Sequence, residues 1–149
     1  MKKAIVVIFI LALAVTALAF TGCGDSGGAD SPEQVVEKFL KASMSGDADT
    51  AYELVTQADK DELTDKQELT EGFSEAFGTA YEVGKGTVSG DIAKVPVEFD
   101  LGEQAMGMKL EFNVVLHKED GAWRISGNDT GLEMEKSLEE LFGDLDTSE

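Results

Sequence analysis

Cys23 is the residue whose chemistry is most directly predictable from its neighbours. It is the single cysteine among 149 residues, and it follows Thr21 and Gly22, two small residues after an apolar segment over residues 4–20. Its thiol can be joined to a diacylglycerol through a thioether bond. In an exported protein an unpaired cysteine is otherwise unusual, because cysteines there form disulfides in even numbers. We therefore expect Cys23 to be lipidated.

The first 22 residues have the layout of a secretory signal peptide. Two lysines precede an apolar run of 17 residues, which is shorter than the roughly 20 that a membrane-spanning helix prefers. The sequence Phe20-Thr21-Gly22-Cys23 resembles the bacterial lipobox, with Phe20 in place of the usual leucine. An ordinary signal peptide followed by a free thiol is the alternative. We expect cleavage before Cys23 and a flexible tether over residues 23–30 that holds the domain on the extracytoplasmic face of the cell membrane.

The balance of charge excludes several kinds of partner and cofactor. The chain has 30 acidic and 12 basic residues, and loss of the two lysines with the signal peptide leaves a net charge of −20. Such a surface repels nucleic acid. With Cys23 acylated and His117 the one histidine, zinc lacks a ligand set, and the acidic runs 47–49 and 59–62 lack the residue that closes a calcium loop. We therefore expect no metal, no cofactor and no nucleic-acid partner.

Helical periodicity predicts three helices before the first strand. The first opens with the capping box Ser31-x-x-Gln34, and Asp47 is expected to cap the second. The third is predicted over residues 64–78, beginning with a Thr-x-x-Gln box. Gly72 lies inside it and is expected to cost about 1 kcal/mol relative to alanine.

Period-two alternation then predicts an antiparallel sheet, apolar on one face and mostly polar on the other, which helices cover on one side. The expected strands cover residues 80–88, 93–101, 108–116 and a last strand around 123–125. The Asp120-Gly121 turn is expected to bring Trp123 and Ile125 to the inward face. Pro96 lacks an amide donor, so its strand is expected at an edge or at a bulge.

A final amphipathic helix is predicted to begin near Thr130 and to pack on the domain. A partner-binding helix and a loosely docked tail are the alternatives. Its narrow apolar stripe comprises Met134, Leu138, Leu141, Phe142 and Leu145. The chain is thus divided into a signal peptide (1–22), a tether (23–30), an α+β domain (31–128) and a C-terminal helix with an acidic tail (129–149).

Several packing and turn motifs run through the domain: Ser31-Pro32, Val35-Val36, Phe39-Leu40, Gly46-Asp47, Ala51-Tyr52 and Asp120-Gly121-Ala122-Trp123-Arg124-Ile125. In these motifs and in the order of its elements, the chain resembles the nuclear transport factor 2-like superfamily, also described as the SnoaL-like or cystatin-like cone. More narrowly, it is similar to small bacterial lipoproteins that carry such a domain of unknown function. The resemblance covers residues 31–126 and implies an α+β fold in which N-terminal helices pack on a curved antiparallel sheet. The C-terminal amphipathic helix predicted from periodicity lies outside the resemblance.

The resemblance also implies a cone that holds a small apolar ligand or supports contact with an envelope protein. His117 is expected on the polar, solvated face. Tyr52 and Tyr81 are expected to pack their rings in the core while their hydroxyl groups reach solvent. We expect a non-catalytic module, because acid–base and nucleophilic catalysis need ionisable groups close together and the inward strand positions carry none. A cone enzyme of isomerase or hydrolase type, with a tyrosine and acid site, is the alternative. The cone, largely filled, is expected to be lined by Phe39, Tyr52, Phe73, Phe77, Phe99 and Phe112.

Overall fold

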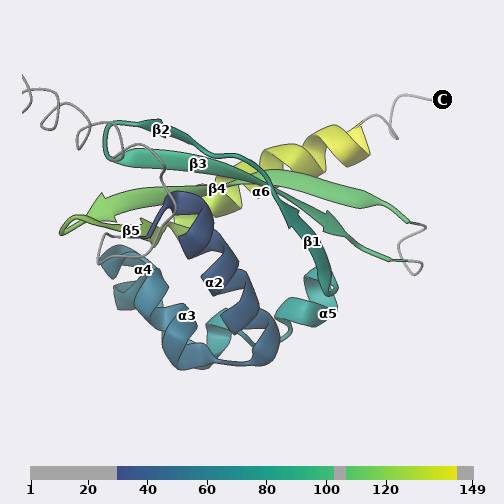
Figure 1. The fold of residues 1–149 in the computed structure, drawn as a ribbon. Helices are drawn as coiled ribbons and strands as arrows, with labels where there is room; N and C mark the ends of the chain where they lie inside the picture. Colours follow the sequence, from purple (N-terminus) through teal and green to yellow (C-terminus); the bar gives the residue numbers. More distant parts are fainter. Residues whose placement is uncertain (1–29, 103–106, 144–149) are drawn as a thin grey trace, which may run out of the picture.

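A computed structural model describes residues 30–102 and 107–143. Its elements are α2 (Pro32–Ser45), α3 (Ala48–Leu54), α4 (Gln57–Glu62), η2 (Lys66–Leu69), α5 (Phe73–Phe77), β1 (Ala80–Val83), β2 (Thr87–Ser89), β3 (Ile92–Asp100), β4 (Lys109–Glu119), β5 (Ala122–Ile125) and α6 (Gly127–Gly143). Helices α2 to α5 lie together under one face of the curved sheet, and α6 lies apart from them against β4 (Figure 1). The predicted fold class, N-terminal helices on a curved antiparallel sheet with a C-terminal helix, is confirmed.

Helix α2 forms where the sequence predicts it. The Gln34 amide donates to Ser31 Oγ (3.3 Å), and the Ser31 amide donates to Gln34 Oε1 (2.9 Å). This box satisfies two donors that a helix leaves unpaired at its start. Val36 and Leu40 are buried in the core, and Gly46 ends the helix with a φ of 77°. The first predicted helix is confirmed.

The second helix is also confirmed, and a further short helix was not predicted. Asp47 caps α3, where its carboxylate accepts from the Thr50 amide (3.1 Å). Helix α4 follows Thr56, whose hydroxyl accepts from the Asp59 amide (3.3 Å). The Thr56 amide donates to the Ile125 carbonyl (2.9 Å). The link between α3 and α4 is therefore tied to the last strand.

The predicted continuous helix over residues 64–78 is wrong. Gly72 has a φ of 71°, a left-handed conformation that a right-handed helix cannot contain. The chain instead forms the 3-10 turn η2, a bend and the short helix α5. The residue that caps η2 is Asp65 rather than the predicted Thr64.

The sheet has the order β1-β3-β4-β5, and β2 pairs with β3 beyond the end of β1. Its long central pair joins β3 to β4, from Ile92 opposite His117 to Asp100 opposite Lys109. The alternation predicted for these two strands is confirmed, whereas the strand predicted over residues 80–88 is split into β1 and β2. The buried inward positions of the central pair are Ala93, Val95, Val97, Phe99, Leu110, Phe112, Val114 and Leu116.

Of the two placements predicted for Pro96, an edge or a bulge, the structure has the second. Strand β3 has a partner on both sides, so it is not an edge strand. Val83 pairs with Val97 and Thr87 pairs with Lys94, which leaves three residues, 84–86, opposite the two residues 95–96, as in a bulge. The Pro96 carbonyl accepts from the Gly84 amide (2.8 Å). The nitrogen of Pro96 points to the same side of β3 as its carbonyl. The amide hydrogen that proline lacks would therefore face the bulge, where no regular strand pairing requires it.

The Asp120-Gly121 turn fixes the register of the last hairpin. Both residues have positive φ values, 50° and 82°, as a type I′ turn requires. Glu119 and Ala122 are therefore direct partners, and the strand continues with Trp123 turned inward. Trp123 is only 8% exposed, which confirms the predicted inward orientation.

Helix α6 begins earlier than the predicted Thr130. Ser126 Oγ accepts from the amide three residues ahead (3.3 Å), and the Asp59 carboxylate accepts from the first two amides of the helix (2.9 and 3.3 Å). Met134 and Leu138 pack against the core. The helix thus packs on the domain as predicted, although none of its described residues is fully buried.

Candidate functional site

An apolar cavity of about 150 Å³ lies between the inward face of the sheet and helices α2, α5 and α6. The structure places five of the six predicted lining residues around it: Phe39, Phe73, Phe77, Phe99 and Phe112. Aliphatic side chains of α2 and the sheet complete much of the wall: Val36, Leu40, Val114 and Ile125. The inward face of the cone is therefore not completely filled.

The aromatic residues form one connected wall. Phe99 and Phe112 stack with ring centroids 5.6 Å apart and an interplanar angle of 18°. Phe77 lies 5.1 Å from Phe99 and 5.0 Å from Phe73, which in turn meets Phe39 edge-on at 6.3 Å. Such pairs contribute roughly 0.5–1.5 kcal/mol each beyond burial. The wall combines residues from four elements, α2, α5, β3 and β4, of which α2 is the most distant in sequence.

Tyr52, the sixth predicted lining residue, does not line the cavity. On α3 the inward position belongs to Ala51, which is fully buried, so the Tyr52 side chain is turned by about 100° away from that position. The Lys60 ammonium lies 5.3 Å from the centre of the Tyr52 ring. Tyr81 contacts Phe99 with ring centroids 6.2 Å apart but also lies outside the cavity lining.

None of the described residues around the cavity carries an ionisable side chain. Its one polar side chain is Thr130, whose hydroxyl oxygen accepts from the Val115 amide (3.0 Å). A general acid or base would have to face the bound molecule within hydrogen-bond reach. The cavity can therefore hold an uncharged molecule, but its walls supply no proton-transfer group.

Helix α6 contributes lining residues that the sequence prediction omitted. Thr130, Gly131 and Met134 close one side of the cavity. Met134 belongs to the apolar stripe predicted for this helix, and Gly131 lies one turn before it. The apolar stripe therefore indicates that α6 packs against the core. Which of its residues reach the cavity depends on where the helix starts.

A separate polar hollow of about 240 Å³ brings His117 and Asp129 together. His117 Nε2 lies 2.7 Å from Asp129 Oδ2, and the Ser126 hydroxyl donates to the same oxygen (3.1 Å). His117 lies on the outer face, as predicted. Its side chain is 39% exposed, because the first turn of α6 lies against it. The cap at Ser126, which the sequence analysis does not predict, starts the helix early enough to supply Asp129 as this partner.

Cys23, residues 24–29 of the tether and Leu145 lie outside the described residues. Within residues 30–102 and 107–143, no helix combines the length and apolar character needed to cross a bilayer. In those same two ranges, no three histidine, cysteine or acidic side chains gather closely enough to hold a metal ion.

No family model and no curated protein matches the chain. One similar solved structure is an NTF2-like protein from Campylobacter jejuni named as a candidate transpeptidase: 19% identity, 65% of this chain and 98% of that chain covered, TM-score 0.48. Another is an NTF-2 like protein of unknown function from Shewanella oneidensis MR-1, with 19% identity, 62% and 88% covered and a TM-score of 0.39. A third is an LEH-like epoxide hydrolase from M. tuberculosis, with 14% identity, 83% and 100% covered and a TM-score of 0.40.

Two of these structures carry the NTF2-like description that the sequence resemblance named. At such identities and TM-scores, the likeness to any of the three structures carries no argument about function. What this chain does has to be inferred from its own geometry.

Proposed function

We propose that this protein is a lipid-anchored, non-catalytic binding module of the NTF2-like kind, whose cavity holds a small, uncharged apolar molecule. The observation that carries the proposal is the aromatic cavity without an ionisable group in its described lining. Its size limits the ligand. A dry cavity of about 150 Å³ lined by apolar side chains is large enough for a benzene-sized molecule. A ligand of one ring, or a short branched chain, is the class that fits.

The cavity can be tested through Gly131, because this residue lines it and has room beside it. A Cβ built at Gly131 would meet no atom within 4 Å, and leucine favours a helix by roughly 1 kcal/mol over glycine. Gly131→Leu should therefore occupy the cavity while leaving the fold intact. Glu135→Leu introduces the same side chain at an exposed position of α6 outside the lining and serves as the control.

Benzene titrated into the full-length protein in lipid nanodiscs, followed through the methyl NMR signal of Met134, is the direct measurement. The proposal expects a saturable shift that Gly131→Leu abolishes and Glu135→Leu retains. A linear, non-saturating response of the unaltered protein, or equal binding by Gly131→Leu, would contradict it.

The anchor is tested separately at Cys23. Two or more acyl chains hold a protein stably on a bilayer where one does not. Cys23→Ser should therefore move the protein from the membrane fraction to the soluble fraction, or block its maturation. A serine variant that is cleaved normally and remains in membranes at the original level would rule out the lipid anchor.

An enzyme is the second candidate, because His117 and Asp129 form a close pair in the polar hollow. In that arrangement the carboxylate could orient an imidazole base. No described hydrogen bond joins the Ser126 hydroxyl to the His117 ring, so a nucleophile activated by this base is not in place. Complementation in the native host decides between the two candidates. The binding module expects His117→Ala to preserve the phenotype at normal protein level, and its loss would favour the enzyme.

A further inference from the structure

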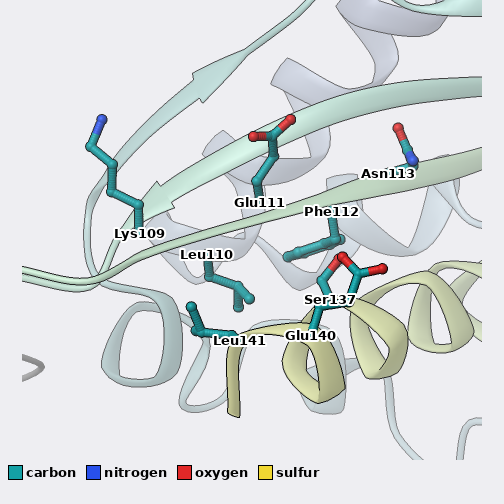
Figure 2. A pocket seen from close by; sticks show the side chains of 8 residues that line it. All are labelled: Lys109, Leu110, Glu111, Phe112, Asn113, Ser137, Glu140 and Leu141. Carbon is teal, nitrogen blue, oxygen red and sulfur yellow. The ribbon is translucent and has the colours of Figure 1, made fainter. Parts of the chain in front are cut away.

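A groove of about 530 Å³ runs between the outer edge of β4 and the last turns of α6, on the side of β4 away from β3. Figure 2 shows Leu110 and Phe112 on the side of β4 that faces α6, with Leu141 of the helix close to Leu110, while Glu111 points to the opposite side of the strand. The residues that line it are Lys109, Leu110, Glu111, Phe112, Asn113, Ser137, Glu140 and Leu141.

Among residues 30–102 and 107–143, no strand pairs with the edge of β4 beside the groove. Strand β5 pairs only with the last residues of β4, from Leu116 to Glu119. The Leu101 amide donates to the Met108 carbonyl, so the even-numbered residues of β4 direct their backbone groups to β3. The odd-numbered residues therefore direct theirs to the groove.

In the part of the chain that the structure describes, this edge finds hydrogen-bond partners at its far end, at Val115. The Val115 amide donates to the Thr130 hydroxyl, and its carbonyl accepts from the Ser126 amide (2.9 Å). No hydrogen bond from a described residue reaches the backbone of Glu111 or Asn113 on the groove side. An edge of this kind can pair with an added strand.

The way α6 is attached leaves this part of the edge open. Its polar contacts with the sheet come from Asp129, Thr130 and Glu133, all in the first half of the helix. Among the described residues, no hydrogen bond joins the helix to β4 beyond Glu133. The last turns rest on half-buried apolar side chains such as Leu138. They can shift to widen the groove without breaking a polar contact.

The charge beside the groove points to the kind of occupant. Glu82, Glu98 and Glu111 are direct cross-strand partners in one row on the outer face. Like charges placed opposite one another in a sheet are destabilising. Lys109 Nζ lies 2.5 Å from Glu98 Oε1, and this hydrogen bond together with the carboxylate charge raises the pKa of Lys109. Among the described residues, no cation pairs with Glu82 or Glu111.

We propose that this groove binds an extended, lysine- or arginine-rich segment of a partner protein, which adds a strand to the open edge of β4. The backbone of Glu111 and its odd-numbered neighbours would pair with the segment, and its alternate side chains would meet two different surfaces. Apolar side chains would contact Leu110, Phe112 and Leu141, while basic ones would meet the glutamate row. A second copy of this chain fits less well, because it would bring Glu111 against the same acidic row.

A short peptide of alternating lysine and valine is the probe, and it is added to the full-length protein in phosphatidylcholine nanodiscs. Its counterpart is the same peptide with N-methyl groups on alternate backbone amides, which keeps the charge and removes strand pairing. Glu111→Gln removes one charge from the groove, and Glu135→Gln removes one charge from the exposed side of α6. Affinity is measured by fluorescence polarisation, and amide hydrogen exchange reports where the peptide lies.

The proposal expects N-methylation and Glu111→Gln each to weaken binding about tenfold, with Glu135→Gln close to the unaltered protein. The amides of Lys109, Glu111 and Asn113 should gain protection from exchange when the unmodified peptide is bound. Equal affinity of the N-methylated peptide would show attraction by net charge alone and overturn the proposal. Absence of binding, or a protein dimer that buries this edge and excludes the peptide, would overturn it as well.

Discussion

Helices α2 and α6 begin with the same kind of cap, but α2 is held by buried side chains and α6 mainly by polar contacts. Each follows a serine whose hydroxyl accepts from the amide three residues ahead, at 3.3 Å in both cases. Helix α2 has 14 residues and buries six of them, including Val36 and Leu40, whereas the 17 residues of α6 include none that is buried. The polar contacts of α6 with the sheet and α4 are concentrated in its first half.

This difference indicates that α2 is part of the structural core, whereas α6 lies over the surface of the domain and borders its candidate sites. The energy that holds α2 is the transfer of apolar surface out of water, which increases with the area buried. Helix α6 contributes little of this energy, yet it closes the apolar cavity on one side and borders the β4 groove on the other. Elements with few buried contacts open locally at low cost. We expect α6 to control access to both sites while α2 maintains the fold.

The largest effect is expected from Leu40→Ala in α2. Leu40 is 2% exposed, and truncation of a buried leucine costs about 2–5 kcal/mol of unfolding free energy. Chemical unfolding of the full-length protein in detergent, followed by the fluorescence of Trp123, measures the cost. Trp123 is the one tryptophan and is buried, so its emission should be blue-shifted before unfolding and red-shifted afterwards. A cost below about 1 kcal/mol would remove the distinction between the two helices.

Leu138→Ala in α6 is the matched change and should have a smaller effect on global stability. The side chain is half-buried, so about 1 kcal/mol is expected from the area it covers. Amide exchange should instead accelerate in the last turns of α6 and remain unchanged in α2. A loss equal to that of Leu40→Ala, with exchange increased throughout the domain, would assign α6 to the core.

The parts of this fold that the sequence predicts are those specified by local signals. The Ser31 capping box, the alternation in β3 and β4, and the Asp120-Gly121 turn act within a few residues, and all three occur as predicted. Gly72 shows where local reasoning fails. Helix propensity predicts only a small cost for Gly72 inside a helix, whereas its positive φ ends the helix altogether.

The candidate sites were harder to predict because they depend on contacts between distant elements. Asp59 caps α6 from α4, and this contact helps to fix where Asp129 lies relative to His117. The aromatic character of Tyr52 predicts that it lines the cavity, but the orientation of α3 gives the inward position to Ala51. The sequence pattern of β4 likewise indicates which side chains face inward, but not that β5 leaves part of its edge unpaired.

The smallest effect is expected at Glu133, which ties α6 to the outer face of the sheet. The Asn113 side-chain amide donates to Glu133 Oε2 (3.1 Å), Lys94 Nζ lies 3.1 Å from Oε1, and these contacts hold the pKa of Glu133 below its ordinary value of 4.5. A lowered pKa stabilises the folded state at pH values above 4.5, and this contribution is lost as the pH falls through the folded-state pKa.

Glu133→Gln should therefore lower thermal stability slightly near neutral pH, and its difference from the unaltered protein should shrink as the pH falls below 4.5. Thermal unfolding across this range, with Glu135→Gln as the exposed control on the same helix, measures the difference. Because the contacts of Glu133 anchor α6, amide exchange in this helix of the unaltered protein should accelerate as the pH falls below 4.5. A stability difference that persists unchanged in acid would mean that the charge of Glu133 does not hold α6 on the sheet. Apolar packing would then be enough to hold this helix, which would contradict the comparison with α2.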